Sequence, residues 1–217
     1  MAVSESTAQR YKLQDPDVRL MLEVRDGSAT AFEELMLRYQ DRLVNWLEHL
    51  VGNRDRAEDL AQDVFLRVYR ARERYVPGAK FSTWLFTIAN NVASNARRSL
   101  ARRREINIVA TESGSMPANP LDYMVQASSG LMPARQADKS EMRDIVQIAI
   151  SSLNERQRAA LLLSKFEDMS YADIAEVMGL TSKAIKSLLS RARVNLREVL
   201  EPYLERGEQP NQNGNKT

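Results

Sequence analysis

The sequence of 217 residues contains no cysteine and only one histidine, His49. Without cysteine there is no disulfide bond, no thiolate nucleophile and no cysteine-ligated zinc, and one histidine excludes a histidine-rich metal site. No apolar run approaches the length of a membrane span, and the N-terminus lacks the apolar core of a secretory signal. The sequence therefore predicts a soluble cytoplasmic protein that inserts in no membrane and uses no metal ion or cofactor.

Glycine and proline are also scarce, with 8 and 7 residues, and aromatic residues make up only 6% of the chain. Strand signals are nearly absent, so the sequence predicts an all-α fold. The formal net charge is +2. Any affinity for nucleic acid must therefore come from local patches and not from bulk charge.

The stretch from Ser170 to Arg193 predicts two short helices joined by a tight turn. Ser170 and Asp173 form a capping box at the start of the first helix, and Gly179 ends that helix in the left-handed conformation. This pattern is typical of a helix-turn-helix motif. No acidic residue occurs between Thr181 and Arg197, so the second helix has a cationic outer face that suits DNA. The alternative is an ordinary helical hairpin with a solvated charged face.

A helix from about Asp55 to Arg74, with Asp55 as its predicted cap, has two distinct faces. Its core stripe consists of Ala57, Leu60, Ala61, Val64 and Val68, which recur at steps of three and four residues. A second face combines acidic, amide and exposed apolar groups and consists of Asp59, Gln62, Asp63 and Leu66. This face is either a solvated surface or a docking surface for a protein partner.

The next predicted helix, from Phe81 to about Leu100, is unusually rich in asparagine. Asparagine is a poor helix former, so Asn91 and Asn95 stand where alanine or leucine would make a better helix. Amides and cations beside aromatic rings are typical of surfaces that bind single-stranded nucleic acid. The alternative is a core helix with a solvated basic end.

Changes in composition along the chain predict two small helical domains joined by a flexible linker. The expected divisions are a mobile tail over 1–14, a helical bundle over 15–104, a linker over 105–138, a helix-turn-helix domain over 139–204 and a mobile tail over 205–217.

Two blocks of the sequence resemble bacterial sigma factors of the sigma-70 family. The stretch DRAEDLAQDVFLRVYRARERY, followed by FSTWLFTIANNVASNARR, resembles region 2 of these proteins. The stretch SLNERQRAALLLSKFEDMSYADIAEVMGLTSKAIKSLLSRARVNL resembles region 4. A short chain with only a linker between these blocks looks like the extracytoplasmic-function (group 4) class, in which the two regions form a helical bundle and a helix-turn-helix domain.

The resemblance implies an alternative sigma factor, and not an enzyme, that binds core RNA polymerase and initiates transcription at promoters with −10 and −35 elements. The implied partners are promoter DNA and the clamp helices and flap region of the polymerase. An anti-sigma factor is a further candidate, because such proteins inhibit many relatives. In the family, region 2 docks on the clamp helices of the largest polymerase subunit. The matching residues, called the polymerase face below, are Asp59, Gln62, Asp63, Leu66 and Arg67.

The resemblance also implies two sets of DNA-binding residues. The −10 set, which would capture a base flipped out of the melted duplex, consists of Lys80, Phe81, Trp84, Asn91, Asn95, Arg97 and Arg98. The −35 set consists of Ser182, Lys183, Lys186, Ser187, Ser190 and Arg191. Many relatives carry a basic residue where this chain has Leu188. We therefore expect either a different −35 preference or a larger share of phosphate contacts from Lys183 and Arg191.

Two other functions account for parts of the sequence. A helix-turn-helix regulator that binds an operator without touching polymerase would explain Ser170 to Arg193, but not the asparagine-rich helix. An enzyme could use four acids as magnesium ligands for phosphoryl transfer, namely Asp55, Glu58, Asp59 and Asp63. The chain has no glycine-rich phosphate loop, and Asp55 is expected to serve as a helix cap, so no catalytic residue is predicted.

Overall fold

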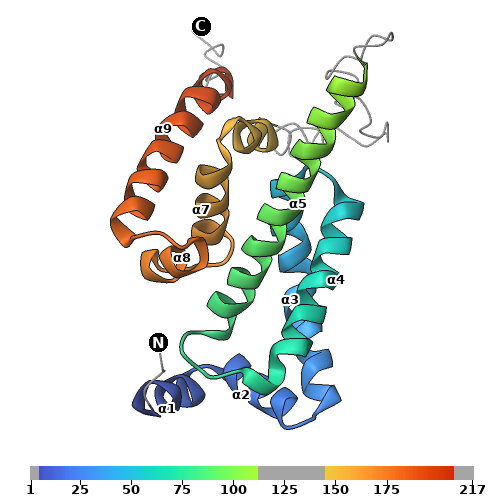
Figure 1. The fold of residues 1–217 in the computed structure, drawn as a ribbon. Coiled ribbons are helices and arrows are strands. Elements are labelled where there is room, and N and C mark those ends of the chain that lie inside the picture. The colour runs from blue at the N-terminus through green and yellow to red at the C-terminus, as the bar shows by residue number, and fades with distance from the viewer. Residues whose placement is uncertain (1–4, 112–144, 208–217) are drawn as a thin grey trace, which may run out of the picture.

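The computed structural model describes residues 5–111 and 145–207, and within these ranges every regular element is a helix (Figure 1). This confirms the predicted all-α fold. The N-terminal bundle contains α1 (Glu5–Gln14), α2 (Pro16–Arg25), α3 (Ala29–Val51), α4 (Arg54–Ala71), the 3₁₀ turn η1 (Arg72–Arg74) and α5 (Phe81–Thr111). The C-terminal domain contains a helical segment over 145–152, α7 (Glu155–Lys165), α8 (Tyr171–Met178) and α9 (Ser182–Gly207).

The N-terminal bundle is built around α3, whose buried residues recur every three or four positions. Leu35, Tyr39, Leu43 and Leu47 are all buried along one side of this helix. The predicted core stripe of α4 packs against α3, with Leu60 partly buried and its other members buried. On α5 the buried face includes Leu85, Phe86, Ala89, Val92 and Ala93. Burial of each large apolar side chain favours folding by roughly 1.5–3 kcal/mol, so this core holds α4 and α5 in place.

Helix α4 begins two residues earlier than the sequence predicts. Gly52 ends α3 in the left-handed conformation, with φ 73°. The chain then turns at Asn53, whose side chain accepts a hydrogen bond of 2.8 Å from the backbone N–H of Arg56. Asn53 is therefore the N-cap, and Asp55 lies within the first helical turn.

The N-terminal stretch predicted as a tail contains helix α1. Its residues include good helix formers such as alanine, glutamine and arginine, and the helix buries none of them completely. Only Tyr11 packs in part against the core. At the other end of the bundle, α5 continues beyond residue 104 to Thr111. The rest of the predicted linker and most of the C-terminal tail lie outside the described residues.

The helix-turn-helix motif forms as the local sequence signals predict. The side chains of Ser170 and Asp173 cap α8 reciprocally, and Gly179 follows it with φ 63° and ψ 37°. Thr181 then caps α9, since its hydroxyl accepts a hydrogen bond of 3.2 Å from the N–H of Ala184. Ile174, Ile185 and Leu189 fill the space between the helices and are fully or almost fully buried.

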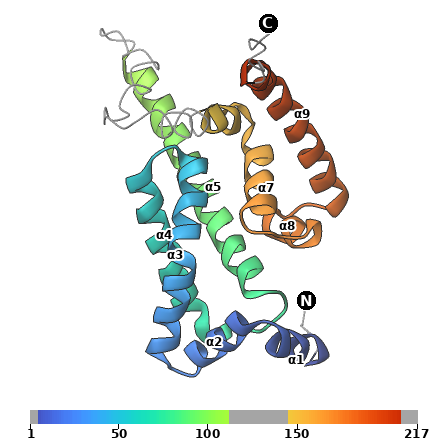
Figure 2. The ribbon, with the colours of Figure 1, turned by 180° about the vertical axis from the view of Figure 1, so that it is seen from behind.

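The two halves of the chain pack against each other. Helix α8 lies along α5, and α7 contacts α3, as Figures 1 and 2 show from opposite sides. The buried apolar residues of both halves form one connected cluster. The structure therefore brings the helix-turn-helix motif directly onto the asparagine-rich helix.

Candidate functional site

The polymerase face lies on the side of α4 that points away from the core. Four of its five residues are exposed and Asp63 is half-buried. The Arg67 Nε donates to both oxygens of the Asp63 carboxylate, at 3.1 Å each. Leu66 lies beside this ion pair with 53% of its surface exposed. An exposed leucine rimmed by charged groups is typical of a protein docking site.

An aromatic residue that the sequence analysis did not single out extends this face. Tyr69 is 43% exposed and follows Leu66 by three residues, so both lie on the same side of α4. Its ring contacts the Phe32 ring, with centroids 5.2 Å apart, and the Arg72 guanidinium lies 4.1 Å from the ring centroid. The helical spacing from Gln62 and Leu66 could have indicated Tyr69 from sequence.

The −10 set is divided between the surface and the core. Lys80, Asn91, Asn95 and Arg98 are exposed, whereas Trp84 and Arg97 are half-buried. Arg98 donates a 2.8 Å hydrogen bond to the side-chain oxygen of Asn95. Asn91 and Asn95 are one helical turn apart, so both amides lie on one exposed side of α5.

Phe81 is the member of the −10 set that the structure places inside the protein. Its side chain is 1% exposed, and its ring packs 5.2 Å from that of Tyr39 and 6.0 Å from that of Trp84. Phe81 thus anchors the start of α5 in the core. Phe81 is the first residue of an amphipathic helix, and its apolar side chain packs into the core. The sequence alone does not distinguish this packing role from base stacking.

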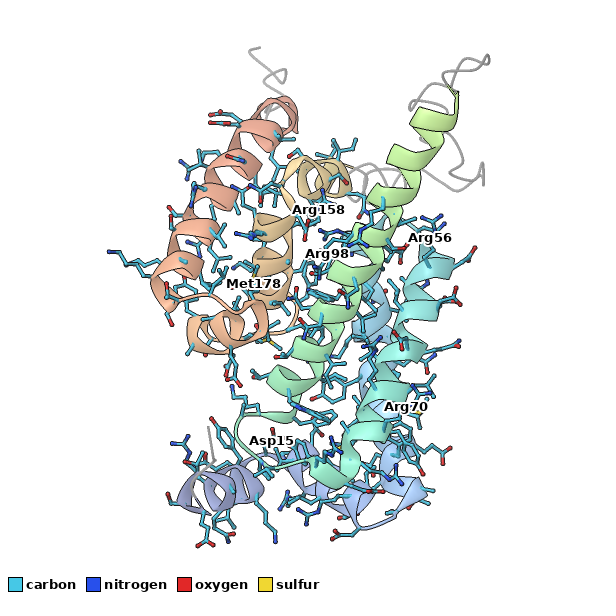
Figure 3. All side chains as sticks on the ribbon, in the orientation of Figure 1. Asp15, Arg56, Arg70, Arg98, Arg158 and Met178 are labelled. Carbon is cyan, nitrogen blue, oxygen red and sulfur yellow. The ribbon has the colours of Figure 1, made fainter. Side chains whose placement is uncertain are left out.

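Asp15 holds the start of α5 and the loop before it. One carboxylate oxygen caps α2 by accepting from the N–H groups of Asp17 and Val18, and the other accepts from the Phe81 N–H at 2.9 Å. Figure 3 shows Asp15 where α1, α2 and the start of α5 meet. One side chain therefore satisfies orphan donors at two helix N-termini.

A second row of polar residues runs along α5 next to the −10 set. We call it the polar stripe, and its members, spaced by three or four residues, are Thr83, Thr87, Asn90, Ser94 and Arg97. Thr83 is 0% exposed, and its hydroxyl donates to the Asp173 carboxylate at 3.3 Å. The Asn90 amide donates to the backbone oxygen of Val177 at 3.3 Å. Part of the polar stripe is therefore covered by α8.

Two further cations of the bundle pair with acids of the C-terminal domain. Arg97 forms an ion pair with Glu155, and Arg42 pairs with Glu167 at 2.5 Å. Burial and the nearby charge of Arg158 lower the pKa of Arg97. Burial raises the pKa of Glu167, and the hydrogen bond and charge of Arg42 only partly oppose this.

All six residues of the −35 set are exposed on α9. The Arg191 guanidinium donates to the Ser187 hydroxyl at 3.1 Å, which fixes it across the outer face of the helix. A shallow depression beside α9 is lined in part by Lys183, Leu188 and Arg191. Arg156, from the first turn of α7, lines the same depression and adds a cation that the sequence pattern did not place there.

Metal and membrane sites were also sought in the described parts of the chain. Residues 5–111 and 145–207 contain no group of three or more histidine, aspartate or glutamate side chains that could hold a metal ion. No helix in these ranges is long and apolar enough to cross a membrane.

The fold and the exposed residues define the class: a two-domain helical protein that presents a helix-turn-helix motif and, on α4, an exposed face of acidic and apolar residues. Residues 35–103 match sigma-70 region 2, and residues 143–196 match sigma-70 region 4. The chain belongs to the sigma-70 family of RNA polymerase sigma factors, within its extracytoplasmic-function class.

Similar proteins cover nearly the whole chain. The RNA polymerase sigma-H factor of Pseudomonas aeruginosa is 32% identical over 191 residues, which are 88% of this chain and 97% of that protein. The RNA polymerase sigma factor CarQ of Myxococcus xanthus is 35% identical over 176 residues, 81% of this chain and 92% of that protein.

Solved structures show the same fold. The sigma factor RpoE of Bartonella quintana, in complex with the anti-sigma factor NepR, has a TM-score of 0.56 and 28% identity, and the match covers 78% of this chain and 96% of that one. CnrH in complex with the cytosolic domain of CnrY has a TM-score of 0.61 and 22% identity, over 87% of this chain and 99% of that one. The protein is a sigma factor that binds core RNA polymerase and promoter DNA, and the operator-binding alternative is not favoured.

Proposed function

We propose that this sigma factor divides its work among three surfaces. The polymerase face on α4 binds the clamp helices of core RNA polymerase, the exposed part of the −10 set captures unpaired promoter DNA, and the −35 set reads duplex DNA. The observation that carries the proposal is the position of the polymerase face. All five residues lie outside the buried stripe of α4, and four of them are polar or charged residues around the exposed Leu66.

The −10 assignment is supported by polar groups on an otherwise well-packed helix. Asn91 and Asn95 are exposed beside the half-buried ring of Trp84 on α5. Amides can hydrogen-bond to base edges, and aromatic rings can stack on unpaired bases. Phe81 is left out of this surface and supports it from the core.

The −35 assignment is supported by the outward position of the whole set on α9. Lys186 and Arg191 are cations on a helix whose inner side packs against α7 and α8. A helix held in this way by a helix-turn-helix motif can enter a major groove. Arg156 stands at its edge and suits a phosphate contact.

Three further points belong to the proposal. The protein acts in the cytoplasm, where core polymerase and the chromosome are found, and it is an initiation factor without catalysis of its own. The flap region of polymerase is the partner of the C-terminal domain. An anti-sigma factor is a candidate regulator, since the similar RpoE of Bartonella quintana was solved with one.

A pair of variants on α4 tests the polymerase face. Gln62→Ala combined with Asp63→Ala should weaken core polymerase binding by about 1–3 kcal/mol, the range of interface hot spots, and lower run-off transcription accordingly. Glu58→Ala is the matched control, because Glu58 also forms an ion pair with an arginine four residues away, Arg54, as Asp63 does with Arg67. The control should bind polymerase like wild type, with helical circular dichroism unchanged in both. Equal binding by the double variant and wild type would contradict the assignment.

A further inference from the structure

The contact between α5 and α8 has a consistent polarity. Lys80 and Thr83 donate to the carboxylate of Asp173, and Asn90 donates to a backbone oxygen of α8. Further along, Arg97 pairs with Glu155. In each of these contacts between described residues, α5 or Lys80, which directly precedes it, supplies the donor and the C-terminal domain supplies the acceptor.

Acceptors arranged in this way match the chemistry of a nucleic-acid strand. Phosphate and base-edge oxygens accept hydrogen bonds from lysine, arginine, hydroxyl and amide donors. The Asp173 carboxylate occupies the place of a phosphate between Lys80 and Thr83, and the Val177 carbonyl occupies that of a base-edge oxygen at Asn90. The surface of α8 that meets α5 therefore resembles the ligand proposed for this helix.

The covered and exposed rows of α5 are adjacent. Asn90 faces α8 and is half-buried, whereas Asn91, the next residue, is exposed. Successive residues of a helix are about 100° apart around its axis. A strand bound at Asn91 and running on to Lys80 would therefore cross the surface that α8 occupies.

The exchange of one occupant for the other is chemically feasible. Thr83 is completely buried, so loss of its acceptor without replacement would be unfavourable. When a nucleic-acid strand replaces α8, each donor can keep an acceptor. Contacts between domains within a chain are commonly polar and transient, which fits such an exchange.

We infer that the structure is a self-occluded state, in which α8 competes with the unpaired −10 strand for α5. Asp173 has two roles in this state: it completes the capping box of α8, and it contacts Lys80 and Thr83 on the other half of the chain. The inference rests on the proposed −10 function of α5. It also predicts that α8 must leave α5 before the strand can bind.

Asp173→Gln tests the contact. Glutamine at this position can still complete a capping box with Ser170, but it removes the negative charge that faces Lys80. Glu176→Gln is the matched control, because Glu176 is an exposed acid on the same helix, and among the described residues no hydrogen bond or ion pair joins its side chain to α5. Thr83→Val is a second variant, which removes the donor from the other side and leaves α8 unchanged.

Two measurements serve as readouts. Because the chain contains no cysteine, dyes can be attached at introduced cysteines alone. Dyes on Asp41→Cys and Glu201→Cys, one exposed position in each half, report the distance between the halves of the full-length protein by energy transfer. Binding of a fluorescent pool of random single-stranded 15-mers reports access to α5. Asp173→Gln should lower the transfer efficiency and raise affinity for the pool by about 3- to 10-fold, the effect of losing one ordinary hydrogen bond. Thr83→Val should act in the same direction more weakly, and Glu176→Gln should match wild type.

Asn91→Ala with Asn95→Ala, in the Asp173→Gln background, separates this inference from the −10 proposal. Loss of the gained affinity supports strand binding at the −10 set, whereas unchanged affinity would reject that assignment without affecting the energy-transfer result. The self-occlusion is overturned if Asp173→Gln and Thr83→Val behave like Glu176→Gln. It is also overturned if the halves separate and affinity for the pool does not rise.

Discussion

The two helices proposed to read DNA, α5 and α9, differ in how much of their polar surface is free. On α9 all six residues of the −35 set are exposed. On α5 the exposed amides of Asn91 and Asn95 lie beside the polar stripe, whose donors are partly bound by the C-terminal domain. The proposed duplex-reading surface on α9 is therefore accessible in this structure, whereas the proposed single-strand surface on α5 is partly covered.

This difference follows from how each helix is built into its half. Helix α9 packs on α7 and α8 by one side only, through residues such as Ile185 and Leu189. Helix α5 packs on α3 and α4 by its apolar side and on α8 by the polar stripe. A helix with two packed sides is stable but has less surface for a ligand. We therefore expect −35 contacts to tolerate the closed arrangement and −10 contacts to require its opening.

The largest expected effect tests whether the two halves are separate folding units. Phe86 is fully buried on α5, and its ring packs 5.5 Å from that of Trp46. Phe86→Ala should lower the free energy of unfolding of the N-terminal bundle by about 3–5 kcal/mol, through lost burial and a cavity. Calorimetry should show the bundle transition moving to lower temperature while the C-terminal transition stays.

Ile185→Ala provides the reciprocal control, because Ile185 is fully buried in the C-terminal domain. Its cost, about 2–5 kcal/mol, should appear in the other transition. If both variants shift one common transition by the same amount, the two halves unfold together and are not separate folding units.

The next effect concerns −35 recognition on the open helix. If Lys186 contacts a base, Lys186→Ala should weaken binding to a −35 duplex by about 1–3 kcal/mol and change the sequence preference. Arg197 is a basic control eleven residues further along α9, roughly 16 Å away, and Arg197→Ala should leave the preference intact. Binding should be measured across duplex sequences and salt concentrations, because a phosphate contact lowers affinity evenly and reduces the salt slope by about one.

Arg191→Ala is treated in the same way, with the additional loss of the hydrogen bond to Ser187. A wild-type footprint and salt slope in both variants would mean that α9 does not enter the groove.

Local signals predicted the helix-turn-helix motif well, because Ser170, Asp173 and Gly179 act on their own chain neighbours. The same locality explains what was missed. The contacts of Asp173 with Lys80 and Thr83 join residues about 90 positions apart, and its capping role already accounted for its presence. Thr83 could not be recognised as buried, since a threonine within a polar row is usually exposed.

The sequence predicts which side of a helix is buried more reliably than it predicts the role of each residue on that side. The buried and exposed sides of α4 follow directly from its apolar spacing, including the position of Leu66. The family resemblance places Phe81 in the −10 set, whereas its ring is buried in the core, because an aromatic residue at a helix start can serve either role. Asn53, and not Asp55, is the N-cap of α4, because Gly52 ends α3 directly before it. Both residues are suitable caps and lie two positions apart, so the sequence alone does not decide between them.

Asn90 and Asn91 offer a smaller and sharper test, because they are neighbours of the same type with different surroundings. Asn91→Ala should reduce open-complex formation by about 3- to 10-fold, as expected for one lost hydrogen bond, and should leave energy transfer between the halves unchanged. Asn90→Ala should instead lower the energy transfer, because it removes the bond to Val177.

Permanganate reactivity of −10 thymines measures the open complex on duplex and on pre-melted bubble templates. A bubble should recover only part of the Asn91→Ala loss, since it supplies the unpairing energy but not the hydrogen bond. Wild-type reactivity of Asn91→Ala on duplex DNA would remove Asn91 from the −10 surface.

The smallest expected effect is a pH dependence at Glu167, in the contact between the halves. Its side chain is 3% exposed and pairs with Arg42, yet burial raises its pKa above the ordinary value. A carboxyl whose pKa is higher in the folded protein stabilises the fold most when it is protonated, and this contribution is lost as the pH rises through the raised pKa. Wild type should therefore gain stability relative to Glu167→Gln as the pH falls from neutral toward the ordinary pKa of a glutamate.

Asp173 should act in the opposite direction and at lower pH. Burial disfavours its charge, but the hydrogen bonds from Ser170 and the charge of Lys80 outweigh burial, so its pKa lies below the ordinary value. Its contribution is lost only as the pH falls through that lowered pKa.

The Glu167 prediction is checked by melting temperatures. Those of wild type and Glu167→Gln, measured from neutral pH down to the ordinary pKa of a glutamate, should differ by less than about 2 °C. A constant difference at all pH values would show that Glu167 is not protonated more readily in the folded protein, and that Arg42 fully compensates its burial.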